Sequence, residues 1–460
     1  MIPAKFLIER RNNLRKLINE GIIILPANKL KPKNYRSNTY KFRQDSSFYY
    51  FTGINRPDLF LIIDVDNDST YLFGNDYDEE DYIWMGIMPK LKDLADNSGI
   101  DNVEPLCNLK DFIVKRKKSK IHYLPIYSDD ILLHLSLLLD ENIEKINNSF
   151  SHDLIKAIFK LRSIKDAFEI ENIENTLNNV TYNFFVEIMK ITKPGLYEYD
   201  LRAIIEKIVI SKNCYNAFEP ICTVHGEILH NNNYSNMLKD GQLLLVDAGA
   251  ESAELYATDI TRTIPVSGKF SDIQKEVYEI VLKAQIKAIE SIRPGVKYYE
   301  IHKNAVKVIT EGLINLKLMK GNIEDIIEEC AYALFFPHGI GHMLGMDVHD
   351  MESFGEDIIG YDENIKRSNK FGLKYLRYAK ELVAGNVFTI EPGIYFNKFL
   401  IEKWQRDNKF RNFINYSLLE KYNDFGGLRI EDDILVTQDG YRVLGKPIPK
   451  TIEEIESIMN

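Results

Sequence analysis

Residues 271–308, SDIQKEVYEIVLKAQIKAIESIRPGVKYYEIHKNAVKV, decide the fold class, because the same pattern occurs earlier in residues 166–208. Both segments open with a capping-box pattern and continue with apolar residues at helical spacing. The first helix of each should end at a Pro-Gly turn, at 193–195 and at 293–295, and a second helix follows. Strand-like segments come next in both copies. The repeat predicts a duplicated α+β domain whose site lies where the two halves meet.

The first third of the chain has a different pattern. The chain has 460 residues, and 45% of them are hydrophobic, which is enough for two or three domains with ordinary cores. A helix is predicted at 131–139, and the strand-like segments are 21–25, 59–63 and 70–73. We therefore expect an α/β N-terminal domain over residues 1–160, followed by the duplicated α+β domain over residues 161–460.

Composition excludes several classes of protein. The formal net charge is −10, which argues against a nucleic-acid-binding protein. The four cysteines, Cys107, Cys214, Cys222 and Cys330, are too scattered for a disulfide scaffold or a thiolate zinc site. Neither a targeting segment nor a membrane span is visible, so the sequence predicts a cytoplasmic protein without a membrane partner.

Two aspartates lie on consecutive predicted strands of the duplicated domain. Residues 242–250, QLLLVDAGA, read as a buried strand that carries Asp247, and Asp259 begins the next strand. A hairpin centred near Ala253 would place these two acids directly opposite each other. Two buried carboxylates at that spacing repel unless a cation neutralises them. The pair therefore favours a metal site over two unrelated turn residues.

A cluster of histidines follows in residues 335–350, FFPHGIGHMLGMDVHD. His338, His342 and His349 are interleaved with glycines that permit close backbone approach. The glycines also argue against a helical HExxH zinc motif, so we expect one histidine ligand per metal ion.

Two glutamates complete the candidate ligand set. Glu391 follows the apolar strand 387–390, and Glu431 lies within the apolar run 426–436. Hard oxygen ligands dominate the set, which suits two divalent ions, with Mn²⁺ favoured and Co²⁺ or Zn²⁺ as alternatives. A pair of metal ions that activates water and polarises a carbonyl is suited to amide hydrolysis.

The motifs DAGAE, TDITRT, HGIGHMLGMDVHD, TIEPGIY and GGLRIEDD together resemble those of the metallopeptidase family that contains methionine aminopeptidase, aminopeptidase P and prolidase. The resemblance covers residues 160–450 and implies the duplicated pita-bread fold. Residues 40–53, YKFRQDSSFYYFTG, resemble the creatinase-like N-terminal domain of aminopeptidase P and prolidase. The resemblance therefore implies hydrolysis of Xaa-Pro bonds in peptides that carry proline in the second position.

The resemblance also implies roles for individual residues. The implied metal ligands are Asp247, Asp259, His342, Glu391 and Glu431, with Asp259 and Glu431 as bridges. His349 resembles the histidine that contacts the substrate carbonyl, His338 resembles one that lines the proline pocket, and His230 matches one near the scissile bond. Glu391 would also transfer the proton to the leaving nitrogen. Arg429 and Tyr395 resemble supporting residues beside the metal ions.

The resemblance leaves alternatives within the family. We favour an aminopeptidase P that acts on longer peptides. Prolidase is the alternative, because the polar insertion between Tyr395 and Gly426 and the position of Arg377 resemble prolidase. Arg377 would then bind the carboxylate of a dipeptide, or it is an ordinary solvated arginine. Asn231 departs from the aromatic residue common in relatives, which affects the substrate cleft. Complete ligand positions argue against creatinase and against a non-catalytic binding protein on this fold. The resemblance implies a homodimer or a homotetramer.

Overall fold

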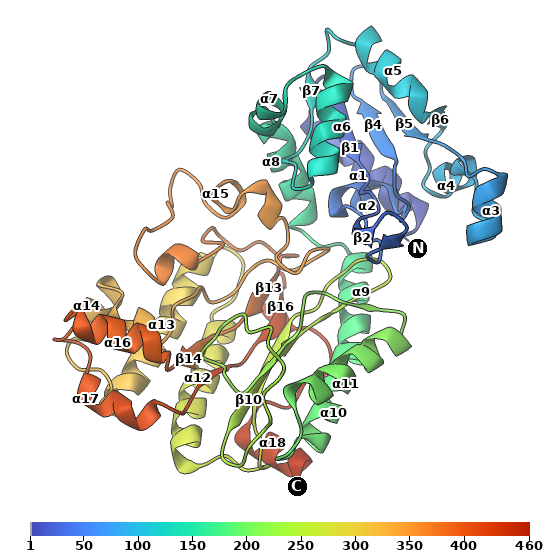
Figure 1. The fold of residues 1–460 in the computed structure, drawn as a ribbon. Coiled ribbons are helices and arrows are strands. Elements are labelled where there is room, and N and C mark those ends of the chain that lie inside the picture. Colours follow the sequence, from blue (N-terminus) through green and yellow to red (C-terminus); the bar gives the residue numbers. More distant parts are fainter. Residues whose placement is uncertain (1) are drawn as a thin grey trace. The chain divides into compact units, whose positions relative to one another are not determined.

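The structure, a computed structural model, describes residues 2–460, which form two compact units (Figure 1). Unit 1 comprises Met1–Arg162 and Glu352–Gly355, and unit 2 comprises Ser163–Met351 and Glu356–Asn460. Within residues 2–460, no helix is both long and apolar enough to cross a bilayer.

Unit 1 is built around a mixed sheet with the strand order β6-β5-β4-β1-β7. Its strands are β1 (Ile22–Pro26), β4 (Phe60–Asp64), β5 (Ser69–Gly74), β6 (Asn102–Pro105) and β7 (Ile121–His122). The helices are α1 (Ala4–Leu17), α2 (Ser46–Thr52), α3 (Glu79–Met85), α4 (Leu91–Asn97), α5 (Leu109–Lys115), α6 (Asp129–Leu139), α7 (Ile143–Asn148) and α8 (His152–Arg162). A short hairpin is formed by β2 (Pro32–Tyr35) and β3 (Asn38–Thr39). Apolar side chains of β1, β4 and α6 share one core, as the sequence patterns predict.

The first half of unit 2 follows the predicted order of helices and strands. Its elements are α9 (Ala167–Thr176), η2 (Leu177–Thr181), α10 (Tyr182–Ile191), α11 (Glu198–Ser211), β8 (Tyr215–Asn216), β9 (Ile221–Thr223), β10 (Leu243–Ala248), β11 (Ala250–Glu251) and β12 (Ile260–Pro265). The capping box of Asp166 and Glu169 starts α9. The helix from 167 to 191 contains a π-helical turn, η2, which the sequence did not predict. Thr181 in this turn hydrogen-bonds Thr258 at 2.8 Å, which ties the turn to the segment before β12.

The second half repeats this arrangement. Its main elements are α12 (Asp272–Glu290), α13 (Tyr298–Asn315), β13 (Val387–Ile390), β14 (Gly393–Tyr395), β15 (Gly427–Arg429), β16 (Asp432–Val436), β17 (Tyr441–Val443) and α18 (Ile452–Met459). Shorter helices are α14 (Ile323–Glu328), α15 (Glu356–Ile359), α16 (Lys398–Arg406) and α17 (Tyr416–Leu419). Figure 1 shows β10, β13 and β16 between α9–α11 on one side and α12–α13 on the other.

The two halves meet at their strands. The backbone N–H of Glu431 donates to the carbonyl of Thr261 at 3.1 Å, which joins the start of β16 to β12. Thr263 Oγ1 donates to the carbonyl of Arg429 at 3.1 Å. The junction of the duplicated halves is therefore the place where the acidic motifs come together.

The hairpin of β10 and β12 has a different register from the expected one. Asp247 lies opposite Thr261, so the prediction that Asp247 directly faces Asp259 is wrong. The turn between the strands is centred near residue 254, because Glu251 pairs with Ala257. Within this turn, Leu255 has a φ of +62°. Moving a turn centre by one residue shifts each partner by two residues. Because side chains two residues apart on a strand share a face, Asp259 still points to the same side as Asp247.

Gly249 allows the close approach between the strands of this hairpin. A Cβ atom at this position would lie 1.7 Å from the carbonyl oxygen of Thr258. We expect Gly249→Ala to lower the free energy of unfolding by about 2–4 kcal/mol, because the backbone must move to relieve the clash. Gly440→Ala is the matched control, since its nearest neighbour would be Thr437 Oγ1 at 4.0 Å. Urea denaturation followed by circular dichroism measures both, and equal midpoints would contradict the prediction.

Candidate metal centre

Each half of unit 2 supplies one acid at the end of a strand and one at the start of its antiparallel partner. Asp247 is the second-last residue of β10, and Asp259 immediately precedes β12. In the second half, Glu391 follows β13 and Glu431 precedes β16. The duplication therefore brings carboxylates from equivalent positions of both halves to one junction.

Asp259, His342 and Glu431 form a compact group in which one ligand atom from each lies within 4.8 Å of the others. His342 Nε2 is 3.3 Å from Asp259 Oδ2 and 4.0 Å from Glu431 Oε1. Among the described residues, Asp259 Oδ1, Glu431 Oε1 and Asp247 Oδ1 are buried without a hydrogen-bond partner. Buried oxygens of this kind are costly unless a cation or water occupies the space between them.

The hydrogen bonds of His342 fix the orientation of its lone pair. Its Nδ1 lies 3.0 Å from the carbonyl oxygen of Met343, which can only accept, so Nδ1 carries the proton. Nε2 therefore presents a lone pair to the carboxylate oxygens of Asp259 and Glu431. Burial and the nearby His349 hold the pKa of His342 well below its usual value, so the ring is neutral. A neutral imidazole that faces carboxylates is an arrangement suited to a shared cation.

The crowded acids also have perturbed pKa values. Burial, followed by the charges of Glu431 and Asp247, raises the pKa of Asp259 well above its ordinary value. Burial and the charges of Glu391 and Asp247 do the same to the pKa of Glu431. Burial raises the pKa of Glu391 to about 7, although Arg429 opposes this rise. Ionised carboxylates at this junction therefore require a compensating positive charge.

Arg429 supplies part of that charge through a chain of hydrogen bonds. Its Nη2 donates to Asp247 Oδ2, and its Nη1 donates to the Tyr395 hydroxyl at 2.9 Å. Tyr395 in turn donates to His338 Nε2 at 2.8 Å, because His338 Nδ1 is bonded to the carbonyl of Gly339. Burial and Arg429 lower the pKa of His338 to about 3, so its 3.8 Å contact with Glu391 is not an ion pair.

The remaining predicted site residues lie around this group. The rings of His349 and His342 have centroids 4.3 Å apart. His230 lies in the loop after β9, and partial burial and the charge of Arg429 lower its pKa. Arg377 is part-buried and donates to Glu356 Oε1 at 2.5 Å.

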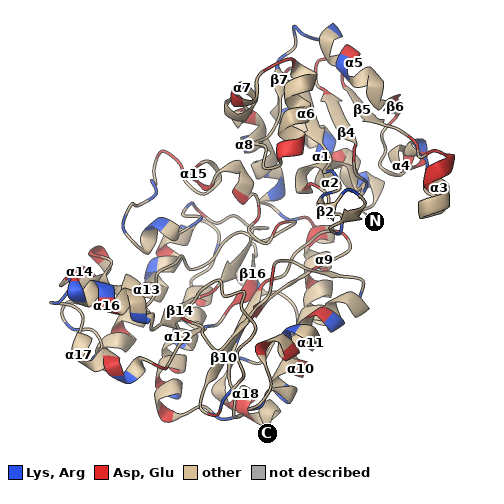
Figure 2. Cartoon of the chain, in the orientation of Figure 1, with Lys and Arg blue, Asp and Glu red and all other residues tan. Residues whose placement is uncertain are grey.

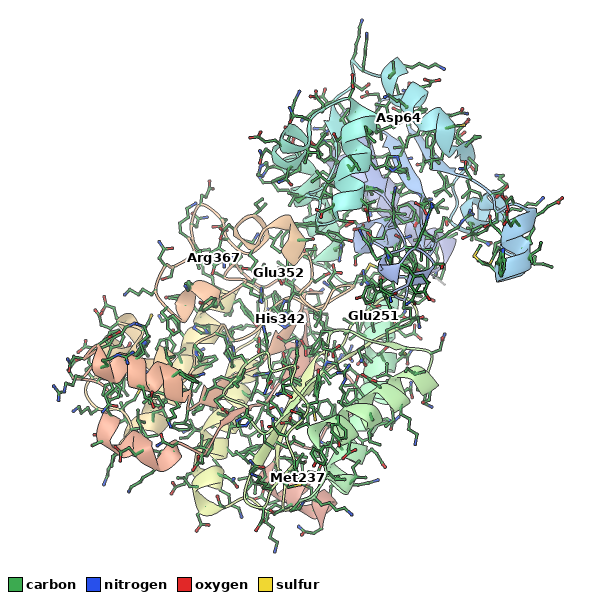
Figure 3. The ribbon with its side chains drawn as sticks, in the orientation of Figure 1. Asp64, Met237, Glu251, His342, Glu352 and Arg367 are labelled. Atoms are coloured by element: carbon green, nitrogen blue, oxygen red, sulfur yellow. The ribbon has the colours of Figure 1, made fainter. Side chains whose placement is uncertain are left out.

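The surroundings of the site are shown in two views. Figure 2 shows acidic residues on β16, in the interior of unit 2, as well as on the surface helices. Figure 3 places His342 within the body of unit 2 and Arg367 on the outer segment beside α15. The donor set of buried carboxylate oxygens and one neutral imidazole fits hard divalent ions, and it offers no cysteine.

Comparison with known proteins identifies the family. The model of metallopeptidase family M24 matches residues 175–438, and the model of the aminopeptidase P N-terminal domain matches residues 7–123. The chain belongs to metallopeptidase family M24. This confirms the predicted α+β class, with a creatinase-like N-terminal domain followed by the pita-bread catalytic domain.

Four similar proteins are named as aminopeptidases. A probable Xaa-Pro aminopeptidase of Phaeosphaeria nodorum is 33% identical, covering 99% of this chain and 94% of that protein. A second from Talaromyces marneffei is 32% identical, covering 96% and 93%. Aminopeptidase PepP of Pseudomonas aeruginosa has a TM-score of 0.82 at 29% identity, covering 100% and 98%. A variant of Escherichia coli aminopeptidase P, solved in complex with substrate, has a TM-score of 0.82 at 26% identity with the same coverage.

Sequence reasoning missed several residues of this M24 site. Thr261 Oγ1 donates to Glu431 Oε2 at 2.8 Å and accepts from Arg429 Nε at 3.2 Å. Asp433 Oδ2 accepts from the backbone N–H of Asp259 at 3.1 Å. Thr261 lies in the motif TDITRT and Asp433 in the motif GGLRIEDD, so their position in these motifs could have identified them as site residues. A strand pattern alone cannot show which polar residue in such a motif orients a ligand and which merely packs.

The Tyr395 hydroxyl links two residues of the site, which permits a stability test. We expect Tyr395→Phe to lower the free energy of unfolding by about 1–3 kcal/mol, because it leaves a buried Arg429 N–H without its acceptor. Tyr441→Phe, at an exposed position of β17, is the control and should change little. Thermal unfolding measures the difference, and equal midpoints for both variants would show that the hydroxyl contributes nothing.

Proposed function

We propose that this chain is a metal-dependent Xaa-Pro aminopeptidase, which releases the residue that precedes proline at the N-terminus of a peptide. The observation that carries the proposal is the lone pair of neutral His342 facing the carboxylates of Asp259 and Glu431, each of which has one buried oxygen without a hydrogen-bond partner. Membership of family M24 and the Xaa-Pro aminopeptidases among its relatives support the reaction.

The proposed metal ligands are Asp247, Asp259, His342, Glu391 and Glu431. Their oxygen-rich donor set supports two divalent ions, with Mn²⁺ favoured over Co²⁺ or Zn²⁺. When bound, such a pair supplies Lewis-acid polarisation of a carbonyl and activation of water.

The chain's own residues supply the remaining steps. A pKa of about 7 lets Glu391 hold a proton and transfer it near neutral pH to the leaving proline nitrogen. His349, beside His342, donates a hydrogen bond to the carbonyl oxygen of the scissile bond. Arg429 holds Asp247 in place and, through Tyr395, orients His338 toward the proline ring. Exposed His230 contacts the substrate near the bond that is cleaved.

The domain organisation and assembly belong to the same proposal. We place the N-terminal domain in residues 1–160 and the catalytic domain in residues 161–460. Exposed Ile83 and Trp84 of α3, with Ile87 just after it, support assembly into a homodimer or homotetramer, because burial of such apolar side chains is favourable. The cysteines are free thiols, which suits a reducing cytoplasm.

Asp259→Asn tests the metal centre. We expect it to abolish hydrolysis and to remove most of the rise in Tm that Mn²⁺ causes in the unmodified protein, because one of the carboxylates that would hold the ions loses its charge. The Tm of the metal-free protein should not fall, since the substitution removes an acid whose burial already opposes ionisation. Differential scanning calorimetry with and without Mn²⁺ measures both effects. Exposed Asp439→Asn is the control, and retained hydrolysis by Asp259→Asn would show a misassigned cluster.

Substrate length separates aminopeptidase P from prolidase. We expect Arg-Pro-Pro to be cleaved to arginine and Pro-Pro in Mn²⁺ buffer, with kcat/KM at least equal to that for Gly-Pro. Chromatography of the products measures both reactions under the same conditions. Cleavage confined to the dipeptide would instead establish prolidase, and hydrolysis of neither would refute an Xaa-Pro peptidase.

A further inference from the structure

A fully buried ion pair lies beside the histidine that we assign to the substrate carbonyl. Lys165 Nζ is 2.8 Å from Asp350 Oδ2, and each side chain is only 1% exposed. Asp350 directly follows His349 in the chain. Neither residue belongs to the proposed set of metal ligands, and the hydrolysis described above makes no use of either.

The aspartate of this pair closes the loop that carries His349. The backbone N–H of Asp350 donates to the carbonyl of Met343 at 2.9 Å, so the two ends of loop 343–350 are hydrogen-bonded to each other. Asp350 Oδ1 accepts from the backbone N–H of Asp347 at 3.4 Å, inside the loop. The loop is therefore closed around the Asp350 carboxylate.

Gly345 permits the ion pair to lie directly against the loop backbone. A Cβ atom at this position would lie 2.4 Å from Asp350 Oδ2 and 3.0 Å from Lys165 Cε. The carbonyl of Gly345 accepts from the N–H of Ala257 at 2.8 Å, close to Asp259. The pair thus fills a space that only a glycine leaves open.

The lysine has a rigid backbone anchor. The N–H of Lys165 donates to the carbonyl of Gly385 at 2.8 Å, and Asn386 Nδ2 donates to the carbonyl of Ser163 at 2.8 Å. Residues 385–386 immediately precede β13, which leads to Glu391. The same strand holds the start of the loop, since the N–H of Leu344 donates to the carbonyl of Val387 at 3.0 Å.

We propose that Lys165 is a positioning residue for His349: its buried ion pair with Asp350 fixes loop 343–350 on the strand that also carries Glu391. This rests on the proposed function, because the consequence concerns the histidine assigned to the scissile carbonyl. Lys165 makes no contact with substrate in this role. It holds the loop conformation in which the His349 ring lies against His342.

The test uses Lys165→Met/Asp350→Asn, which removes the ion pair without leaving a buried unpaired charge. Removing both charges preserves folding better than removing one, so this variant remains measurable where Lys165→Met does not fold. We expect kcat for Arg-Pro-Pro to fall about 10- to 100-fold with KM changed less than about threefold, because the histidine is misplaced while binding persists. The metal content should be unchanged.

A second background separates positioning from general destabilisation. In His349→Ala, the same double substitution should change the residual kcat less than about twofold, because the group that it positions is gone. Arg116→Met is the control, since it breaks the 2.7 Å ion pair of Arg116 with buried Asp64 in unit 1. This variant should lose stability without losing kcat.

Hydrogen exchange gives a readout that does not depend on activity. Amides of residues 343–350 should exchange at least about tenfold faster in Lys165→Met/Asp350→Asn, with no change in Arg116→Met. Unchanged exchange, an unchanged kcat, or an equal loss of kcat in the His349→Ala background would each overturn the proposal. If the unmodified protein cleaves no Xaa-Pro peptide, the proposed function fails, and exchange alone still decides whether the ion pair fixes the loop.

Discussion

The structure of unit 2 depends on one electrostatic constraint, the crowding of buried carboxylates at the junction of its two halves. Asp259 and Glu431 lie within reach of the same imidazole, and both have pKa values raised by burial and by neighbouring acids. Arg429 offsets part of this repulsion through Asp247. The remaining acids stay ionised only where a cation lies beside them, so a bound divalent ion would complete the charge balance of this junction.

Duplication is what makes such crowding achievable. A single hairpin offers one acid at the end of a strand and one at the start of the next, as Asp247 and Asp259 do. The second copy adds Glu391 and Glu431 at the same positions, and the Thr261–Glu431 backbone bridge brings the copies together. Helices α9–α11 and α12–α13 lie on opposite sides of these strands (Figure 1), and the side chains of Asp259 and Glu431 are buried. Burial in turn strengthens the charge interactions between them.

The sequence allowed the fold class, the duplicated order of elements and the acidic motifs to be predicted, because periodicity and Pro-Gly turns are local properties. The pairing register of the strands was harder to predict from the sequence. The turn between β10 and β12 is centred one residue later than expected, and Leu255 in this turn adopts a positive φ that its residue type does not suggest. Partners such as Thr261 and Asp433 depend on contacts about 170 residues away in the chain, and spacing alone does not specify them.

The environments of the acids also explain how one cluster serves two purposes. Asp259 is enclosed, so its ionisation is tied to a cation and it is poorly placed to exchange protons with a substrate. The Glu391 side chain is 20% exposed, and its Oε2 lies 3.9 Å from Arg429 Nε. The charge of Arg429 opposes the effect of burial, and the pKa of Glu391 is about 7. A carboxyl with that pKa can gain and lose a proton at neutral pH. In the proposed function, exposure and the distance to Arg429, rather than residue type, therefore separate Glu391, the acid assigned to proton transfer, from the acids assigned only to cation binding.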